Sequence, residues 1–289
     1  MNTGPTIRVL SLGAGVQSTV LALMACDGTL PGLDAAVFAD TGWEPPAVYE
    51  QVDRLAVELA RVGIPLHRVS SGNLRADTLN PAHRFVSVPY FTRNADGGDG
   101  MGRRQCTSEY KLKPIKVKVR ELLRYPHPTP VPRDVYAEQW IGFSTDEIHR
   151  VRDRLDVNYS WPRYPLLELG MSRKDCQRWL ERAGWGHTAK SACIGCPFHG
   201  NAQWRELRDN HPEQWADAVD FDRRIRKGGA SASPLDGEAF LHRSRVPLDL
   251  APIDRVTRAE YADMQLDLFE DGDPDGCSPY GCRSGGEVA

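Results

Sequence analysis

The first half of the chain alternates short apolar runs with helical patterns, and this alternation limits the fold more than any other feature of the sequence. The apolar runs are five to nine residues long and bounded by turn residues, as strands usually are. We expect strands over residues 7–12, 34–39, 65–69 and 135–143. Helices are expected over residues 16–26 and 45–61, because apolar residues recur there at helical spacing and Pro45 and Pro46 suit a first turn. This order of elements predicts an α/β fold built on a parallel sheet with crossover helices.

From residue 166 onward the pattern changes to helices, loops and tryptophans. Ser172, followed three residues later by Asp175, predicts a helix start, and Gly184 predicts its end. The helices expected in this part cover residues 173–182, 201–208 and 212–226. We therefore divide the chain into an α/β domain over 1–165, a smaller helical region over 166–250, and a terminal helix with a flexible tail over 251–289.

The glycine-rich segment over residues 91–105 is expected to be a long loop. Long loops inside compact domains are often active-site lids, and a plain surface excursion is the alternative.

Composition narrows the class of protein. Seven cysteines in 289 residues are too few for a disulfide scaffold, and the chain opens with no signal-peptide pattern, so we expect a reduced, cytoplasmic protein. No apolar run approaches the roughly 20 residues that a membrane span needs, so we expect no membrane partner. A formal net charge of −3 argues against a surface coated with basic residues for nucleic acid.

A glycine-containing turn joins the first expected strand to the first expected helix. Glycine lets the backbone approach a ligand closely, and a helix N-terminus offers unpaired N–H groups to an anion. The dinucleotide pattern fails because Gln17 and Ser18 stand where its third glycine would be, and a Walker loop would need Gly-Lys-Ser/Thr. The turn predicts an anion site, with a plain βα turn as the alternative. Its candidate binding residues are Ser11, Gly13, Gly15, Gln17, Ser18 and Thr19.

The remaining pattern is Ser-x-Gly-x-x-x-x-Ser, which resembles the PP-loop of ATP pyrophosphatases. The usual form of that loop is Ser-Gly-Gly-x-Asp-Ser, from which this chain departs at Leu12, Ala14 and Gln17. Asp40, Thr41 and Gly42 follow the second expected strand, at the sheet edge where ligands of open α/β sheets bind. They resemble the Asp-Thr-Gly turn that borders the adenine nucleotide in phosphoadenosine-phosphosulfate reductases. A turn chosen for its geometry alone is the alternative.

Two cysteine segments lie far apart in the chain. Cys193 and Cys196 have the Cys-x-x-Cys spacing with which two thiolates grip one metal or one cluster edge, and Cys106 adds a third thiolate. Zinc would need a fourth ligand, for which His199 is the candidate, and an inert turn is a further alternative. Because the cysteine pair is distant in sequence from the glycine turn, we expect metal and nucleotide sites to be separate.

The segment around Cys106 resembles the DNA phosphorothioation protein of the same superfamily, which carries Arg-x-x-Cys-Thr and a later Leu-Lys. The resemblance implies a four-iron four-sulfur cluster on Cys106, Cys193 and Cys196, with one iron left without a cysteine ligand. Arg104 and Lys111 are then expected to meet nucleotide phosphates.

The segment after the fourth expected strand resembles the Gly-x-x-x-Asp-Glu-x-x-Arg segment of the same two families, beginning at Gly142. Asp146 or Glu147 would hold Mg²⁺ against the phosphates, and Arg150 would neutralise charge. A helix start with acidic residues favoured by the helix dipole is the alternative.

Taken together, the four motifs imply a HUP-like adenine nucleotide α-hydrolase domain that binds ATP and Mg²⁺. Asp40, Lys111 and Arg150 are the expected catalytic residues. An acceptor would be adenylated and then receive sulfur from a cysteine desulfurase or another donor. DNA, RNA and a small metabolite are all compatible acceptors, and a dimer is compatible with the family.

Two other functions stay open. One is a phosphoadenosine-phosphosulfate reductase, although the tail with Cys277 and Cys282 lacks the Glu-Cys-Gly-x-His that such enzymes carry. The other is a nucleotide-binding regulatory module. The tail thiols would either relay sulfur or be an incidental pair.

Overall fold

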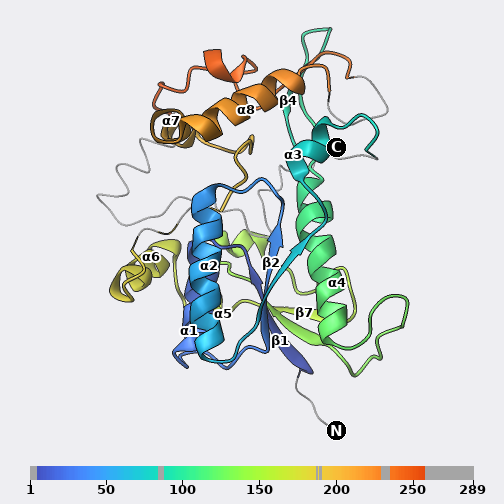
Figure 1. Ribbon diagram of the computed structural model, residues 1–289, viewed down its shortest axis with the longest axis vertical. Coiled ribbons are helices and arrows are strands. Elements are labelled where there is room, and N and C mark those ends of the chain that lie inside the picture. Colours follow the sequence, from blue (N-terminus) through green and yellow to red (C-terminus); the bar gives the residue numbers. More distant parts are fainter. Residues whose placement is uncertain (1–4, 84–87, 187, 189–190, 229–234, 258–289) are drawn as a thin grey trace.

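The computed structural model describes residues 5–83, 88–186, 188, 191–228 and 235–257. Its centre is a five-stranded parallel sheet with the strand order β3-β2-β1-β6-β7, which confirms the α/β prediction (Figure 1). The strands are β1 (Ile7–Leu12), β2 (Ala35–Asp40), β3 (Leu66–Ser70), β6 (Ala137–Trp140) and β7 (Ser160–Arg163).

Strand β7 was not predicted, and Pro162, which lies inside it, is a residue that argues against a strand in a sequence. Proline cannot donate a ladder hydrogen bond and is tolerated mainly on edge strands. The strand order places β7 at the edge of the sheet, where it pairs only with β6 among the described strands.

Helices cover both faces of the sheet, as the alternation of side chains along its strands requires. Leu10 and Leu12 of β1 pack into one core together with α1 (Val16–Cys26), α2 (Pro46–Arg61) and α6 (Arg173–Arg182). Val9 points to the opposite face, into a core shared with α4 (Lys113–Leu122). Figure 1 shows α1 and α2 on one side of the strands and α4 on the other.

The order of the strands contains a switch point. From β1 the chain passes to β2 on one side, whereas β6 pairs with β1 on the other side. In open α/β sheets ligands bind outside the carboxyl ends of the strands at such a point. The turn after β1 and the segment after β6 therefore flank the position where this topology favours a ligand.

The predicted loop over residues 91–105 is wrong for most of its length. It contains a hairpin of β4 (Phe91–Arg93) and β5 (Asp99–Met101), and β8 (Glu238–Phe240) adds a third antiparallel strand. The glycines serve the hairpin turn, in which the Asn94 amide donates to the Gly98 carbonyl at 2.8 Å. Strands of three residues are too short to show an alternating pattern.

A second core lies beyond one end of the sheet, where Figure 1 places α7 (Asn201–Asn210) and α8 (Pro212–Arg224). Trp43, Tyr110, Trp204 and Phe221 are its largest buried side chains. The helices predicted in this half of the chain are present, and α6 begins with the expected capping box between Ser172 and Asp175. The shorter helical segments are α3 (Leu74–Leu79), η1 (Thr107–Leu112), η2 (Thr145–Arg150), α5 (Pro165–Glu168) and η3 (Leu248–Leu250).

The expected tail, with Cys277 and Cys282, lies outside the described residues. In the described part of the chain, no helix is both long enough and apolar enough to cross a membrane.

Candidate functional site

The turn after β1 and the first turn of α1, residues 13–18, form the segment called here the phosphate loop. Ala14 is fully buried and has φ 55°, a left-handed conformation that is uncommon for a residue with a side chain. Ser18 closes the loop, since its hydroxyl accepts from the Gly13 amide at 3.2 Å and donates to the Gly15 carbonyl at 3.3 Å. Gly15 is the N-cap of α1 and has no side chain with which to cap the helix amides. Backbone strain and open helix amides are both typical of anion-binding loops.

A buried glutamine of α2 supports this loop from behind. The Gln51 Nε2 atom donates to the Ala14 carbonyl and to Thr19 Oγ1, both at 2.8 Å. Thr19 is fully buried, so it braces the loop against α2. The sequence prediction missed Gln51. The available signal is its position among Val48, Val52 and Leu55, where a polar residue interrupts the buried face of the helix.

Gly142, at the end of β6, lies directly against the phosphate loop. A Cβ atom on Gly142 would come within 3.0 Å of the Ser18 amide nitrogen. Gln17 reaches toward the same segment, where its Nε2 donates to Ser144 Oγ at 3.4 Å and to Glu147 Oε2 at 3.1 Å. The structure thus brings together two motifs that are more than a hundred residues apart in sequence.

The proposed magnesium ligands brace this segment instead. Glu147 is buried and forms an ion pair with Arg150. Burial raises the pKa of Glu147, while Arg150 and Arg173 act to lower it. Asp146 accepts from Ser144 Oγ at 3.1 Å and from the Arg173 amide at 2.6 Å. Both carboxylate oxygens of Glu147 accept from protein donors, so Glu147 does not fit a magnesium site in this arrangement, whereas the two bonds to Asp146 share its Oδ2 atom.

Ser11 also differs from its expected role. It lies inside β1, is 1% exposed and accepts a hydrogen bond from Gln139 Nε2 at 2.7 Å. Its hydroxyl therefore joins a polar contact between strands and does not belong to the phosphate loop.

The Asp40-Thr41-Gly42 turn follows β2 at the same edge of the sheet. Asp40 Oδ1 accepts from the Gly42 amide at 2.7 Å and from the Tyr49 hydroxyl at 2.8 Å. Burial and this bond to Asp40 raise the pKa of Tyr49. Gly42 has φ 69°, and a Cβ there would lie 2.9 Å from Asn73 Nδ2. Glycine is therefore needed at this position both for its conformation and for the close approach of Asn73.

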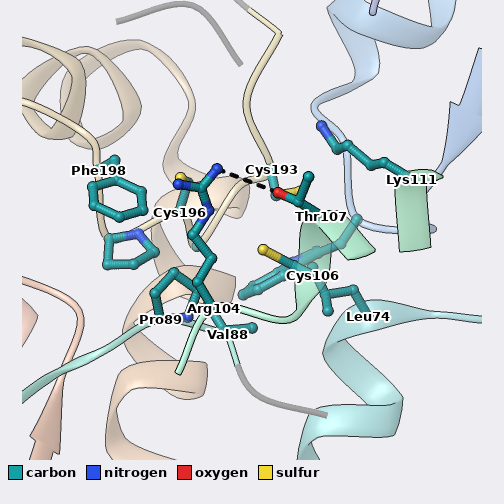
Figure 2. Close-up of a pocket in the computed structure, with 13 residues that line it drawn as sticks. Leu74, Val88, Pro89, Arg104, Cys106, Thr107, Lys111, Cys193, Cys196 and Phe198 are labelled. Atoms are coloured by element: carbon teal, nitrogen blue, oxygen red, sulfur yellow. Dashed lines mark hydrogen bonds between the residues drawn. The ribbon is translucent and has the colours of Figure 1, made fainter. Parts of the chain in front are cut away.

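All three predicted metal ligands line one cavity, called here the cysteine cavity (Figure 2). Its empty volume is about 420 Å³, a figure that includes space open to solvent. Cys106 comes from the segment before η1, whereas Cys193 and Cys196 come from a turn after α6. The remaining lining residues are Trp43, Leu74, Val88, Pro89, Arg104, Thr107, Lys111, Gly195, Pro197 and Phe198.

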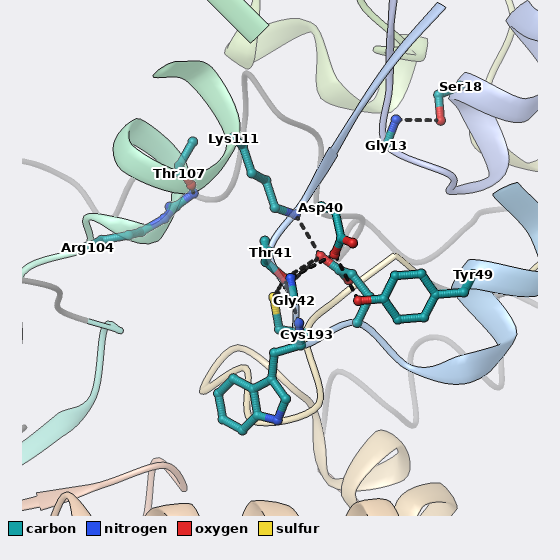
Figure 3. A network of polar contacts seen from close by, with 12 residues as sticks. Gly13, Ser18, Asp40, Thr41, Gly42, Tyr49, Arg104, Thr107, Lys111 and Cys193 are labelled. Carbon is teal, nitrogen blue, oxygen red and sulfur yellow. Dashed lines mark hydrogen bonds and ion pairs between the residues drawn. The ribbon is translucent and has the colours of Figure 1, made fainter. Parts of the chain in front are cut away.

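The basic residues expected at the phosphates also lie here. Arg104 donates to Thr107 Oγ1 at 3.3 Å, and its guanidinium lies 5.4 Å from the centre of the Phe198 ring. Lys111 belongs to η1, a six-residue π-helix, a rare conformation that is frequent at functional sites. Figure 3 shows Arg104 and Thr107 across the Asp40-Thr41-Gly42 turn from Gly13 and Ser18.

The two segments expected to form separate nucleotide and metal sites are in contact. Thr41 Oγ1 lies 3.3 Å from the Cys193 sulfur, and the Ile194 amide donates to the Trp43 carbonyl at 3.0 Å. The turn after β2 therefore contacts the Cys-x-x-Cys turn directly, although about 150 residues separate them in sequence. Distance along the chain says little about distance in a fold whose motifs gather at one edge of a sheet.

His199, the candidate fourth zinc ligand, is buried behind the turn. Its Nε2 lies 3.1 Å from the Cys193 carbonyl oxygen. Among the described residues, no three His, Cys, Asp or Glu side chains are grouped so that they could hold a single metal ion. The donor set of the cysteine cavity is three thiol groups, the residue type that binds iron–sulfur clusters.

Of the two other described cysteines, Cys176 is a core residue and Cys26 is partly buried against the same core. Cys176 is fully buried, and burial raises the pKa of its thiol to about 12. Burial likewise raises the pKa of Cys26 to about 11. Both thiols stay protonated at neutral pH, which makes them poor nucleophiles and poor metal ligands.

Comparison with known proteins does not assign the chain to a family. No protein-family profile matches the sequence, and no curated protein is similar enough to be reported as a relative.

Proposed function

We propose that this protein is a PP-loop ATP pyrophosphatase that adenylates an acceptor for sulfur transfer. The observation that carries the proposal is the meeting of two features at one sheet edge. A strained glycine loop lies at the switch point of a parallel sheet, and a cavity lined by three cysteines adjoins the next turn along that edge. A HUP-like nucleotide domain would account for both features.

In this proposal the chain binds the ATP phosphates with the phosphate loop. The amides of residues 16–18 and the Ser18 hydroxyl would stabilise negative charge, and Gly142 would let the segment after β6 approach. Arg150 is held by Glu147, which in turn bonds Gln17, so a charge-neutralising guanidinium has a fixed place near the loop. Mg²⁺ would arrive with ATP, since magnesium in such sites is bound largely by substrate phosphates and water.

The reaction balances without oxidation or reduction. An acceptor oxygen bonds to the α-phosphorus, the bond from that phosphorus to the bridging oxygen breaks, and pyrophosphate leaves. A hydrosulfide nucleophile then bonds to the adenylated centre, and AMP departs with the acceptor's oxygen. The chain's part is positioning and charge stabilisation.

Cys106, Cys193 and Cys196 would hold a four-iron four-sulfur cluster, which supplies an iron without a cysteine ligand to which sulfide can bind. The mostly apolar wall of the cavity would shield the cluster from water, and Arg104 and Lys111 would offset its negative charge. A reduced, cytoplasmic location belongs to the same proposal, because thiolate ligands must escape disulfide formation.

The acceptor is proposed only as a class, namely nucleic acid or a small molecule with a nucleophilic oxygen. The sulfur donor would be a cysteine desulfurase or an equivalent source. A phosphosulfate reductase is the second candidate, favoured by the Asp40-Thr41-Gly42 turn and by the cysteine cavity.

One assay separates these functions. The protein, purified without oxygen, is incubated with ATP labelled at the α-phosphate, Mg²⁺, sulfide and candidate acceptors, and in parallel with phosphoadenosine phosphosulfate and a thiol. Formation of labelled AMP, together with unlabelled pyrophosphate, supports the proposal. Release of sulfite in the second reaction alone would favour the reductase, and binding of nucleotide without either product would indicate a regulatory module.

A further inference from the structure

Glu44 occupies the junction between the turn after β2 and the cysteine cavity, and no motif pointed to it. Its side chain is 1% exposed. Oε1 accepts from the Thr41 hydroxyl at 3.0 Å and lies 3.5 Å from the Cys193 sulfur and 3.7 Å from Lys111 Nζ. Figure 3 shows this cluster around Thr41 and Cys193.

A buried carboxylate is costly unless donors and a positive charge surround it. The groups around Glu44 come from separate parts of the chain. Thr41 follows β2, Lys111 belongs to η1, and Cys193 opens the Cys-x-x-Cys turn. A shift of any one of them changes the contacts of the others, because all meet at one carboxylate oxygen.

Trp43 adds a second, rigid connection between the same two turns. Its carbonyl accepts from the Ile194 amide, and its ring packs so tightly on Gly195 that a Cβ there would lie 2.1 Å from the ring. The indole nitrogen also donates to Asp217 at 2.6 Å, which fixes the ring on α8. The turn that carries Asp40 and Thr41 therefore cannot move without the Cys-x-x-Cys turn.

We infer that Glu44 is a positioning residue that couples nucleotide binding to Cys193, an inference that rests on the proposed function. ATP bound at the phosphate loop orders the turn from Asp40 to Glu44 and thereby holds Cys193 in contact with Glu44. Because coupling between two sites acts in both directions, a group attached to Cys193 that breaks its contact with Glu44 weakens ATP binding.

The test uses the full chain prepared free of iron, so that its readout does not depend on a cluster or on turnover. Alkylation of Cys193 by iodoacetamide is followed by tandem mass spectrometry, with and without saturating ATP and Mg²⁺. We expect ATP to slow alkylation about fivefold or more, the lower end of typical couplings between sites. In the reverse experiment, protein alkylated at Cys193 binds ATP more weakly, by calorimetry, than unmodified protein.

Glu44→Gln keeps the size of the side chain but removes the charge that holds Lys111 and the thiol. We expect this variant still to bind ATP. In it, ATP should slow the alkylation of Cys193 less than about twofold, and this slowing by ATP is called protection below. Glu50→Gln is the matched control, because Glu50 is an exposed carboxylate on α2, and its protection should equal that of the wild type. Thermal unfolding of each variant reports on folding.

A second pair of variants applies if Glu44→Gln does not fold. Thr41→Val removes the hydroxyl that links Glu44 to Cys193, whereas Thr41→Ser retains it. Loss of protection in the valine variant and its recovery in the serine variant support the coupling.

The outcomes distinguish this inference from the proposed function. If the wild type binds ATP but Cys193 reacts at an unchanged rate, the coupling is wrong and the proposed function stands. If protection survives in Glu44→Gln, or in Thr41→Val where that variant is used, the role of Glu44 is wrong. If the wild type binds no ATP, the proposed function fails, and this inference fails with it.

Discussion

Gly142 sets how closely the end of β6 approaches the phosphate loop. Its Cβ position lies 3.0 Å from the Ser18 nitrogen and 3.2 Å from the Gln17 carbonyl carbon, both backbone atoms that cannot rotate away. An added methyl group must push the first turn of α1 aside. Overpacking of this kind typically costs about 1–3 kcal/mol.

We therefore expect Gly142→Ala to weaken ATP binding about tenfold, which corresponds to about 1.4 kcal/mol, as measured by calorimetry. Gly32→Ala is the control, since no atom lies within 4 Å of a Cβ there. Equal affinity for ATP in the two variants would show that the phosphate loop does not contact the nucleotide.

Gly195 has a comparable role in the cysteine cavity. The ring of Trp43 lies where an alanine methyl group would stand, with 2.1 Å between the nearest carbon and the Cβ position. Because Trp43 is buried and bonded to Asp217, the Cys-x-x-Cys turn has to move instead. Gly195→Ala should therefore lose most of the bound iron, measured by colorimetric analysis after purification without oxygen. Iron content equal to that of the wild type would mean that the position of this turn does not determine metal binding.

At the level of elements, α2 supports the phosphate loop through Gln51. The Ala14 carbonyl and the Thr19 hydroxyl both depend on its amide, and all three groups are buried. Leaving a buried polar group without its partner costs about 1–3 kcal/mol. Gln51→Leu should weaken ATP binding by a similar free energy, because the strained Ala14 conformation loses its support.

Ser172→Ala provides the comparison at another helix. It removes the N-cap of α6, which should lower the free energy of unfolding by about 1 kcal/mol and leave ATP affinity unchanged. If both variants lose stability and neither loses affinity, Gln51 is a packing residue and not a support for the phosphate loop.

The elements that sequence alone could predict are those with a long, regular pattern. Strands β1 and β2 and helices α1, α2 and α6 occupy nearly the predicted residues, because their apolar spacing and caps are local signals. The hairpin of β4 and β5 and its pairing with β8 were missed. Three-residue strands carry no period, and β4 and β8 lie 145 to 149 residues apart in sequence.

The candidate site was predictable in its parts but not in its assembly. Motif spacing pointed to Gly13, Asp40 and the three cysteines. The resemblance also placed Cys106 beside Cys193 and Cys196, and all three line one cavity, but no motif showed that Thr41 touches Cys193. Gln51, Tyr49 and Glu44 carry no motif, and their roles depend on tertiary contacts that a single sequence does not encode in any local pattern.

For the molecule as a whole, buried His242 makes stability depend on pH. His242 is 2% exposed and lies between Ser244 Oγ at 2.7 Å and Asn201 Oδ1 at 3.0 Å. Burial, with a smaller effect of Arg243, lowers the pKa of His242 to about 4. Below pH 6.5 the unfolded chain binds a proton here that the folded chain refuses until about pH 4, so stability falls with pH in that range.

Between pH 6.5 and pH 5, this one group is expected to lower the free energy of unfolding by about 2 kcal/mol. Urea unfolding of the wild type and of His242→Gln at several pH values measures it. The free energy of unfolding of the variant should fall less steeply over this pH range than that of the wild type. Identical slopes in the two proteins would mean that His242 takes up its proton equally in both states.

The central claim about the whole molecule is that two distant segments of the chain meet to form a cluster site beside a nucleotide site. Measurement of iron and acid-labile sulfide in the full chain, purified without oxygen, tests it most directly. We expect about four iron and four sulfide per chain, with a broad visible absorbance. Most of the iron and sulfide should be lost in each of the variants Cys106→Ser, Cys193→Ser and Cys196→Ser. A wild-type protein that carries stoichiometric zinc and no iron, or iron that survives all three substitutions, would contradict the claim.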